Sequence, residues 1–199
     1  MTKVLKQSAK VRTNTTPGSV CKVQIEAVKF ADLWTSYPKT SSPYLDAQGK
    51  VPTGYENQCA IRVSVALGGV GLTMKSFKGA SVTVSGKRAA VRAQELADWL
   101  KLQPFCGLPT RPEEATGASW QDKIKGRTGI VYFKDYWTRL GEKHPTGDHI
   151  DLWNGSKLTA TGTLSQAETF MRFTIGLGSL WGMYSDLGKS TQILFWEIK

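Results

Sequence analysis

Residues 55–67 read YENQCAIRVSVAL, and the rest of the chain is organised around this stretch. The pattern predicts a polar turn that delivers Cys59 to the start of an apolar helix, on which Cys59, Val63 and Ala66 share one face. A thiol in the first turn of a helix lies near the positive end of the helix dipole and near unpaired backbone N–H groups. Both favour the thiolate, which is the nucleophilic form of cysteine.

A cysteine nucleophile needs a base, and the chain has only two histidines. His144 lies in a turn-rich segment and is interpreted as a loop residue. His149 opens residues 149–155, HIDLWNG, which predict a short strand ending in an Asn-Gly turn. On that strand His149, Asp151 and Trp153 face the same way. A helix-borne cysteine followed later by a strand-borne histidine is the chain order of papain-like hydrolases.

Two segments together carry a family resemblance. Residues 57–64, NQCAIRVS, joined to residues 147–155, GDHIDLWNG, resemble the type VI secretion amidase effectors of the fourth family, which are papain-like peptidoglycan hydrolases related in fold to NlpC-type wall peptidases. The resemblance extends from about Phe30 to the C-terminus. It implies cleavage of the γ-D-glutamyl to meso-diaminopimelate amide of the wall peptide. It also implies type VI delivery into the periplasm of a rival bacterium, and a cognate immunity protein as a partner.

The third catalytic residue is open. A triad needs a carboxylate or amide that fixes the imidazole tautomer and supports its charge. The resemblance implies an Asp on the strand after the histidine, but Ala160 stands at that position. Asp151 shares the face of the histidine and is the replacement candidate, or else it caps the strand-to-turn junction. The other candidates are Asp148, Asn154 and Asp186.

The expected mechanism is attack by the Cys59 thiolate on the amide carbonyl, followed by hydrolysis of the thioester. The backbone N–H of Cys59 is expected to help hold the oxyanion, as the start of a helix allows. Asn57 and Gln58 are expected to line the substrate cleft, or else to supply turn polarity. Trp153 is expected to pack on substrate at the rim, or else to occupy the core.

Composition bounds the remaining partners. The 199 residues are enough for one domain with a sizeable core, and the net charge of +10 implies an acidic partner. The basic residues are scattered singly, as at Lys78, Lys87 and Arg92, which argues against a nucleic-acid surface. Cysteines and histidines show no zinc-ligand spacing, so we expect neither a metal nor another cofactor. Cys21 and Cys106 are interpreted as structural thiols, and their pairing stays open.

Targeting signals are not visible. Met1-Thr2-Lys3 opens a polar, basic segment without the apolar core of a signal peptide, and no run is long enough to insert in a bilayer. A protein made in the cytoplasm and acting in a periplasm then needs another route, which the type VI reading supplies. We expect residues 1–19 to be a mobile N-terminal segment and residues 20–199 to be a single catalytic domain.

The order of elements indicates an α+β fold. Helical patterns are expected at 21–34, 59–67, 88–102, 120–125 and 164–180, and strands at 81–84, 129–133, 149–153, 156–163 and 192–198. Helices first and strands after predict N-terminal helices packed on an antiparallel sheet. The resemblance makes this a papain-like, NlpC-type arrangement.

Two other functional readings remain. One is a papain-like cysteine hydrolase with another substrate, such as a phage or housekeeping wall hydrolase or a protease. The other is a non-catalytic basic module that binds wall polymer or nucleic acid, which the alanine at position 160 keeps open.

Overall fold

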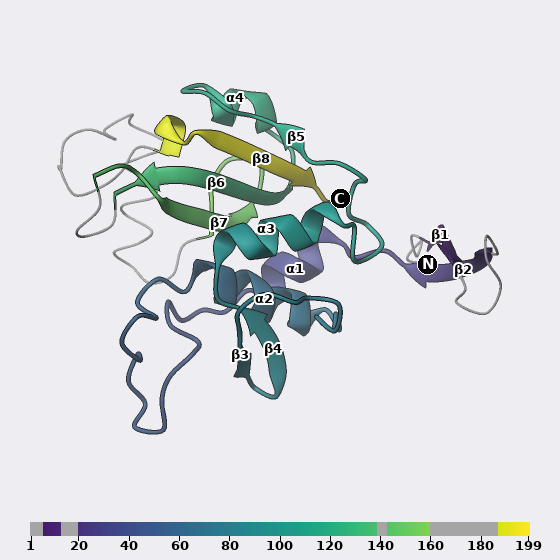
Figure 1. The fold of residues 1–199 in the computed structure, drawn as a ribbon. Coiled ribbons are helices and arrows are strands. Elements are labelled where there is room, and N and C mark those ends of the chain that lie inside the picture. The colour runs from purple at the N-terminus through teal and green to yellow at the C-terminus, as the bar shows by residue number, and fades with distance from the viewer. Residues whose placement is uncertain (1–5, 13–19, 139–142, 160–186) are drawn as a thin grey trace.

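The computed structural model describes residues 6–12, 20–138, 143–159 and 187–199, with the backbone alone for the strands at 6–12 and 20–26. The described part combines helices with antiparallel strands, so the predicted α+β class is confirmed. Figure 1 shows the main sheet with helices α1, α2 and α3 below it and the short α4 above.

A four-stranded antiparallel sheet forms the centre of the fold. Its strands are β5 (Glu113–Glu114), β6 (Gly129–Trp137), β7 (Gly147–Trp153) and β8 (Gln192–Glu197), in the order β5-β8-β6-β7. The strands expected near 129–133, 149–153 and 192–198 are therefore confirmed. Because β7 is the last strand in this order, one edge of its backbone faces away from β6 and toward the helices.

The two faces of the sheet bury alternate residues of each strand, as a period of two requires. One face packs against α1, α2 and α3 and carries Ile130, Tyr132, Ile150, Leu152, Leu194 and Trp196. The opposite face packs against α4 (Trp120–Ile124) and the 3-10 turn Leu187–Lys189 and carries Val131, Phe133, Trp153, Ile193 and Phe195. The sheet is thus buried on both sides, and β7 contributes to both cores.

The helix predicted to begin at Cys59 is confirmed. Helix α2 spans Cys59–Gly69, and Cys59, Val63 and Ala66 are all buried in the core beneath the sheet. It packs between β7 and the seven-residue helix α1 (Phe30–Ser36). A backbone hydrogen bond from the Phe30 N–H to the Lys199 carbonyl, at 3.0 Å, joins α1 to the strand-end residues after β8.

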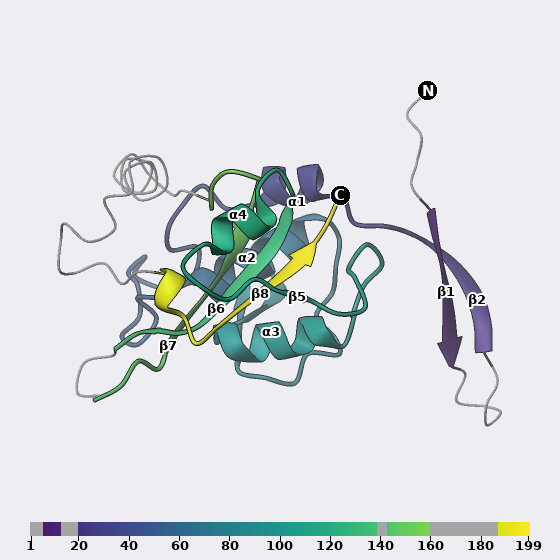
Figure 2. The same cartoon turned by 90° about the horizontal axis from the view of Figure 1, so that it is seen from above.

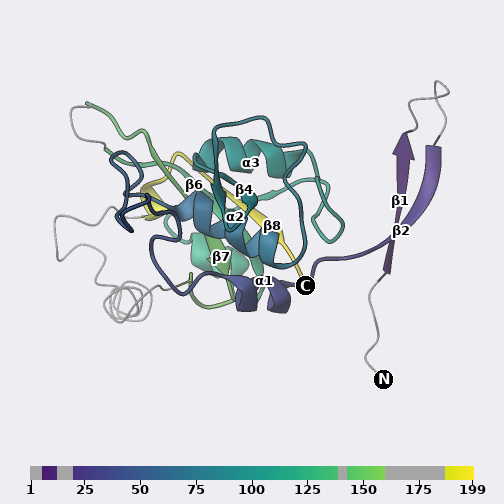
Figure 3. The same cartoon turned by 90° about the horizontal axis from the view of Figure 1, so that it is seen from below.

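The helix expected at residues 21–34 is wrong in its first half. Residues Val20–Glu26 form strand β2, which pairs antiparallel with β1 (Lys6–Arg12), and a helix begins only at Phe30. β-branched residues at 20, 23 and 25 explain the extended backbone. Figures 2 and 3 show this hairpin apart from the main sheet and its helices. The division into residues 1–19 and 20–199 stays a prediction.

The helix expected at residues 88–102 begins later than predicted. Residues Lys87–Ala90 form β4, paired with the expected strand β3 (Ser81–Val84), and α3 spans Ala93–Lys101. Ser85 and Gly86 have φ of 47° and 76°, the left-handed values of a two-residue hairpin turn. The Ser-Gly pair is the turn signal that the helical interpretation passed over.

Some expectations fall outside the described residues. The helix expected at 164–180 and most of the strand expected at 156–163 lie there, although Leu158 forms an isolated bridge with Trp153. Cys106 is a free thiol, and the side chain of Cys21 is outside the description. Among the described helices, none combines the length and the apolar character that crossing a membrane requires.

Candidate active site

Cys59 is the first residue of α2, and the residue before it fixes the entry to the helix. The buried Gln58 side chain accepts a hydrogen bond from the Tyr44 N–H and donates one to the Tyr44 carbonyl, both at 2.8 Å. The rings of Tyr44 and Tyr55 pack 5.1 Å apart in the same loop. This pair of hydrogen bonds, the Gln58 clamp, joins the loop around Tyr44 to the residue that precedes α2. Hydrogen bonds to the loop backbone, as well as side-chain packing, therefore fix the position of the thiol.

His149 reaches the thiol from β7. It lies opposite Phe133 of β6, and its ring packs near Phe133 and Tyr136. Gly147 begins the strand where the chain passes the Trp137 indole, so a Cβ at this position would overlap the ring. Glycine therefore lets β7 pair closely with β6 and brings His149 to the start of α2.

The thiol and the imidazole form a hydrogen-bonded pair. Cys59 is 8% exposed and the His149 side chain 19% exposed. Burial alone would raise the pKa of the thiol, but the hydrogen bond and positive charge of His149, with the Ile150 N–H, bring that pKa below its ordinary value. Burial alone would lower the pKa of His149, yet Asp151 and Cys59 raise it to about 9. Both shifts favour a thiolate beside an imidazolium.

Asp151 places a buried carboxylate next to the imidazole. Its Oδ2 lies 3.6 Å from His149 Nε2, and the residue is 2% exposed. Its Oδ1 accepts hydrogen bonds from the Leu152 N–H, at 2.8 Å, and from the Thr159 hydroxyl. The carboxylate is therefore held in one orientation, with one oxygen directed at the histidine. An imidazole that presents Nε2 to a carboxylate has its Nδ1 available for a hydrogen bond with the thiol.

Arg62 and Tyr37 extend this group of charges and were not selected from the sequence. The Arg62 guanidinium lies over the Tyr37 ring, with Cζ 5.8 Å from the ring centroid. Burial and the nearby Asp151 carboxylate raise the pKa of Tyr37 well above its ordinary value. Arg62 follows Cys59 by three residues on α2, and this i, i+3 spacing was the available signal.

The three residues expected to bind substrate lie in different surroundings. Asn57 is exposed, two residues before Cys59. Gln58, in contrast, is 2% exposed and its amide is bonded to Tyr44, so its described contacts are structural. Trp153 is also 2% exposed, and its Nε1 donates to the Ile124 carbonyl at 3.0 Å. Of the two positions expected for Trp153, the structure shows the one in the core, not the one at the rim of a cleft.

The other residues considered for the site, which are the alternative third residues and the second histidine, make other contacts or are exposed. Asp148 accepts a hydrogen bond from the Asp135 N–H at 3.0 Å, and Asn154 accepts bonds within the turn that ends β7. His144 is exposed. Asp186 and Ala160 lie outside the described residues.

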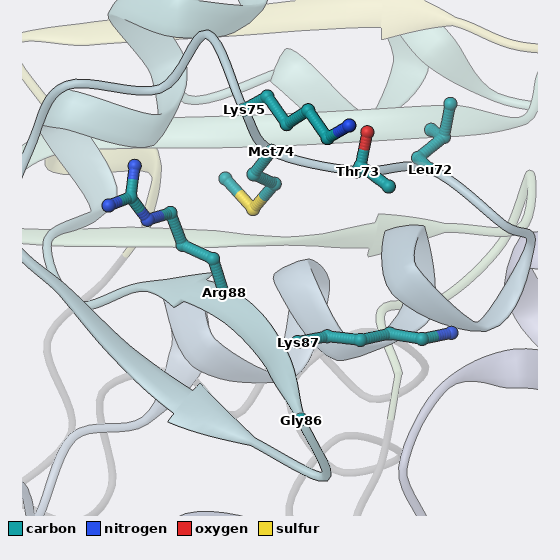
Figure 4. Close-up of a pocket in the computed structure, with 7 residues that line it drawn as sticks. All are labelled: Leu72, Thr73, Met74, Lys75, Gly86, Lys87 and Arg88. Carbon is teal, nitrogen blue, oxygen red and sulfur yellow. The ribbon is translucent and has the colours of Figure 1, made fainter.

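A separate hollow lies near the opposite end of α2. Figure 4 shows residues of the 72–75 loop and of the β3–β4 hairpin around a space of about 400 Å³. In this view Lys75 and Lys87 extend toward one side, and Arg88 extends toward the other. Lys87 donates to the Gly68 carbonyl at 2.5 Å and Arg88 to the Phe77 carbonyl at 2.9 Å. The cations do not converge on one point, so the hollow lacks the arrangement of a small-anion site.

The described histidine, cysteine and carboxylate side chains do not gather in groups of three that could hold a metal ion.

A family profile matches residues 55–196, a span that includes both Cys59 and His149. The family is described as Tae4, type VI secretion system (T6SS) amidase effector protein 4. This chain belongs to the Tae4 family. The resemblance inferred from residues 57–64 and 147–155 is thereby confirmed, and the chain is a type VI secretion amidase effector.

Solved structures of Tae4 proteins share the fold. The structure of the Tae4/Tai4 effector–immunity system from Salmonella typhimurium matches with a TM-score of 0.56 and 21% identity, covering 86% of this chain and 98% of that chain. Tae4 from Enterobacter cloacae matches with the same score and identity, covering 86% and 96%. Salmonella typhimurium Tae4 in complex with Tai4 from Enterobacter cloacae matches with a TM-score of 0.54 and 18% identity, covering 86% and 99%. No curated protein sequence matches the chain.

Proposed function

We propose that this Tae4 protein is a peptidoglycan amidase that cleaves the γ-D-glutamyl to meso-diaminopimelate bond of the wall peptide. Cys59 is the nucleophile, His149 the base and acid, and Asp151 the residue that orients the imidazole. The observation that carries the proposal is the grouping of these residues: a thiol at the start of a helix hydrogen-bonded to an imidazole, whose Nε2 faces a buried carboxylate. This grouping supports a papain-like, NlpC-type hydrolase.

The reaction proceeds through a thioester. The Cys59 thiolate adds to the γ-carbonyl carbon. The resulting oxyanion accepts a hydrogen bond from the Cys59 backbone N–H, which lies in the first turn of α2 and has no partner within the helix. The His149 imidazolium gives its proton to the diaminopimelate nitrogen, and the C–N bond breaks. Water then adds to the thioester while His149 takes its proton, and the C–S bond breaks to release the γ-carboxylate and the thiolate.

Asp151 replaces the missing acid at position 160. The family resemblance implies a carboxylate on the following strand, whereas this chain carries one two residues after His149 on the same strand. Residues two apart on a strand share a face, which accounts for the 3.6 Å separation of Oδ2 and Nε2. The hydroxyl of Thr159, next to Ala160, donates to the other oxygen and helps hold the carboxylate.

The proposed setting follows from the family and from charge. An effector delivered by the type VI system reaches peptidoglycan in the periplasm of the target bacterium, and a net charge of +10 favours binding to an anionic wall polymer. The Salmonella typhimurium relative forms an effector–immunity system with Tai4. We propose that this chain, too, has a cognate immunity protein as a partner.

Digestion of purified sacculi tests the proposal. Wild type and Cys106→Ala are expected to release the same muropeptides cut at the D-glutamyl bond, identified by mass spectrometry, whereas Cys59→Ala and His149→Ala release none. Cysteine-dependent cleavage of another bond would move the assignment to a different papain-like hydrolase. Sacculi that are bound but left intact would support a non-catalytic binding module.

A further inference from the structure

Arg62 is buried inside the group of residues that surrounds the nucleophile. It lies one turn after Cys59 on α2, where Cβ atoms three residues apart are about 5–6 Å from each other. Side chains on a helix lean toward its N-terminus, so the guanidinium extends back over the turn that carries the thiol. Its Nε is buried, and its Cζ lies 5.8 Å from the centroid of the Tyr37 ring.

Three groups around this guanidinium are negative or become negative on ionisation. They are the Tyr37 phenol, the Asp151 carboxylate and the Cys59 thiol, and together they hold the pKa of Arg62 above its ordinary value although burial opposes this. The same three groups come from three elements: the end of α1, strand β7 and the start of α2. A buried cation is stable only beside such partners.

We infer that Arg62 is a positioning residue that keeps a fixed positive charge near the nucleophilic sulfur of Cys59, in the same buried group that contains Tyr37 and the carboxylate of Asp151. The inference rests on the proposed function, because it assigns a task to a residue of the same site. Arg62 donates no proton to the reaction, since a guanidinium stays charged throughout the working pH range. It acts through the thiol, which it stabilises in the ionised form.

The thiol is faced by few charges in the described structure. His149 from β7 and Arg62 from α2 both favour the thiolate, as does the Ile150 N–H, while burial opposes it. Of the two cations only His149 loses its charge within the working pH range, with a pKa of about 9. The arginine therefore supplies, with the Ile150 N–H, stabilisation of the thiolate that does not change with the protonation of His149.

The test is the pH dependence of Cys59 alkylation by iodoacetamide, measured by mass spectrometry of the Cys59 peptide in the full chain. Arg62→Met is expected to raise the midpoint by about one pH unit and to slow alkylation at pH 6 about tenfold, because the loss of a neighbouring opposite charge shifts a pKa by about one unit. Arg62→Lys keeps the charge and is expected to restore most of the wild-type profile. Arg92→Met removes an exposed arginine from the start of α3 and is the matched control, with an unchanged profile.

Folding of each variant is checked by circular dichroism, and Arg62→Gln replaces Arg62→Met if the methionine variant unfolds. A midpoint within about 0.3 pH units of wild type in a folded, uncharged variant would overturn the inference, since a factor of two in ionisation is the smallest resolvable effect. The alkylation needs no substrate. An unchanged midpoint in an active amidase refutes the role of Arg62 alone, whereas a shifted midpoint in a protein that cuts no muropeptide refutes the proposed function alone.

Discussion

Replacing Asp151 with Asn is the perturbation that best separates a catalytic carboxylate from a structural one. Two donors, the Leu152 N–H and the Thr159 hydroxyl, hold the oxygen of residue 151 that points away from the histidine. An asparagine is constrained to place its carbonyl oxygen on these donors, which turns its NH₂ group toward His149 Nε2. Nε2 must then accept, so the imidazole proton moves to Nδ1, the nitrogen that should take the proton of the thiol.

The magnitude follows from this geometry. Two unit charges 3.6 Å apart interact by roughly 5 kcal/mol at an effective dielectric constant of about 20, which is the ceiling for the lost attraction. A carboxylate at this range shifts a partner's pKa by about 1–3 units, so the pKa of His149 should fall from about 9 toward its ordinary value. The wrong tautomer costs about 10⁴-fold in kcat in a serine protease triad, and we expect a loss of about 10³- to 10⁴-fold here.

The assay combines kinetics with histidine NMR. The chain has two histidines, and His144 is exposed, so ¹⁵N-labelled histidine gives two ring systems that His144→Gln assigns. Wild type should show a protonated Nε2 with a titration midpoint near 9, whereas Asp151→Asn should show the Nδ1–H tautomer and a lower midpoint. Asp148→Asn removes the same charge one residue before the histidine and serves as the control, with kcat/KM within about threefold of wild type.

The outcome that refutes this reasoning is specific. If Asp151→Asn keeps its Nε2–H tautomer and most of its kcat/KM, Asp151 does not orient His149 and its buried contacts are structural. If Asp148→Asn shows the loss instead, the acid was assigned to the wrong neighbour of the histidine.

The other predictions concern pH, the loop clamp and the buried tryptophan. Activity requires thiolate and imidazolium together, so kcat/KM should rise as pH passes the lowered pKa of Cys59 and fall as pH passes about 9, where His149 loses its proton; a rate that stays constant through pH 9–10 would contradict this assignment. Gln58→Met should lower the free energy of unfolding in urea by about 2–4 kcal/mol, because it leaves the Tyr44 N–H and carbonyl without their partner, and a change below about 0.5 kcal/mol would argue against the clamp. Trp153→Phe should lower the free energy of unfolding by about 1–3 kcal/mol and leave kcat/KM within about threefold of wild type. A raised KM at unchanged stability would instead support a contact between Trp153 and the substrate.

The sequence was most informative where periodicity and chemistry agreed. The apolar run after Cys59 predicted α2, and the alternation after His149 predicted both the strand and the common face of His149 and Asp151. The buried Ile150 and Leu152 on one side and Trp153 on the other follow the same alternation. Local pattern thus predicted each half of the site.

The features that the sequence did not reveal depend on contacts between distant segments. Nothing local distinguishes a Gln58 that lines a cleft from one bonded to Tyr44, 14 residues earlier. Thr159 reaches Asp151 only because the turn after β7 folds back, through an isolated bridge between Trp153 and Leu158. Such contacts follow from tertiary packing.

The two errors in secondary structure have a local cause. At residues 20–26 a helical spacing of apolar residues competed with β-branched residues, and the backbone is extended. At residues 87–90 the Ser85-Gly86 turn returns the chain to pair with β3 before α3 can begin. In both places strand pairing decides the conformation over a pattern that also fits a helix.

The central claim is that the sulfur of Cys59 becomes covalently bonded to the substrate acyl group. Intact-protein mass spectrometry of wild type, quenched in acid during turnover of a soluble stem peptide, measures this directly. We predict an added mass equal to the γ-D-glutamyl-containing fragment, located on the Cys59 peptide, sensitive to hydroxylamine and absent from Cys59→Ala. Turnover of the peptide by Cys59→Ala, or an acyl adduct located on Cys106, would contradict the account.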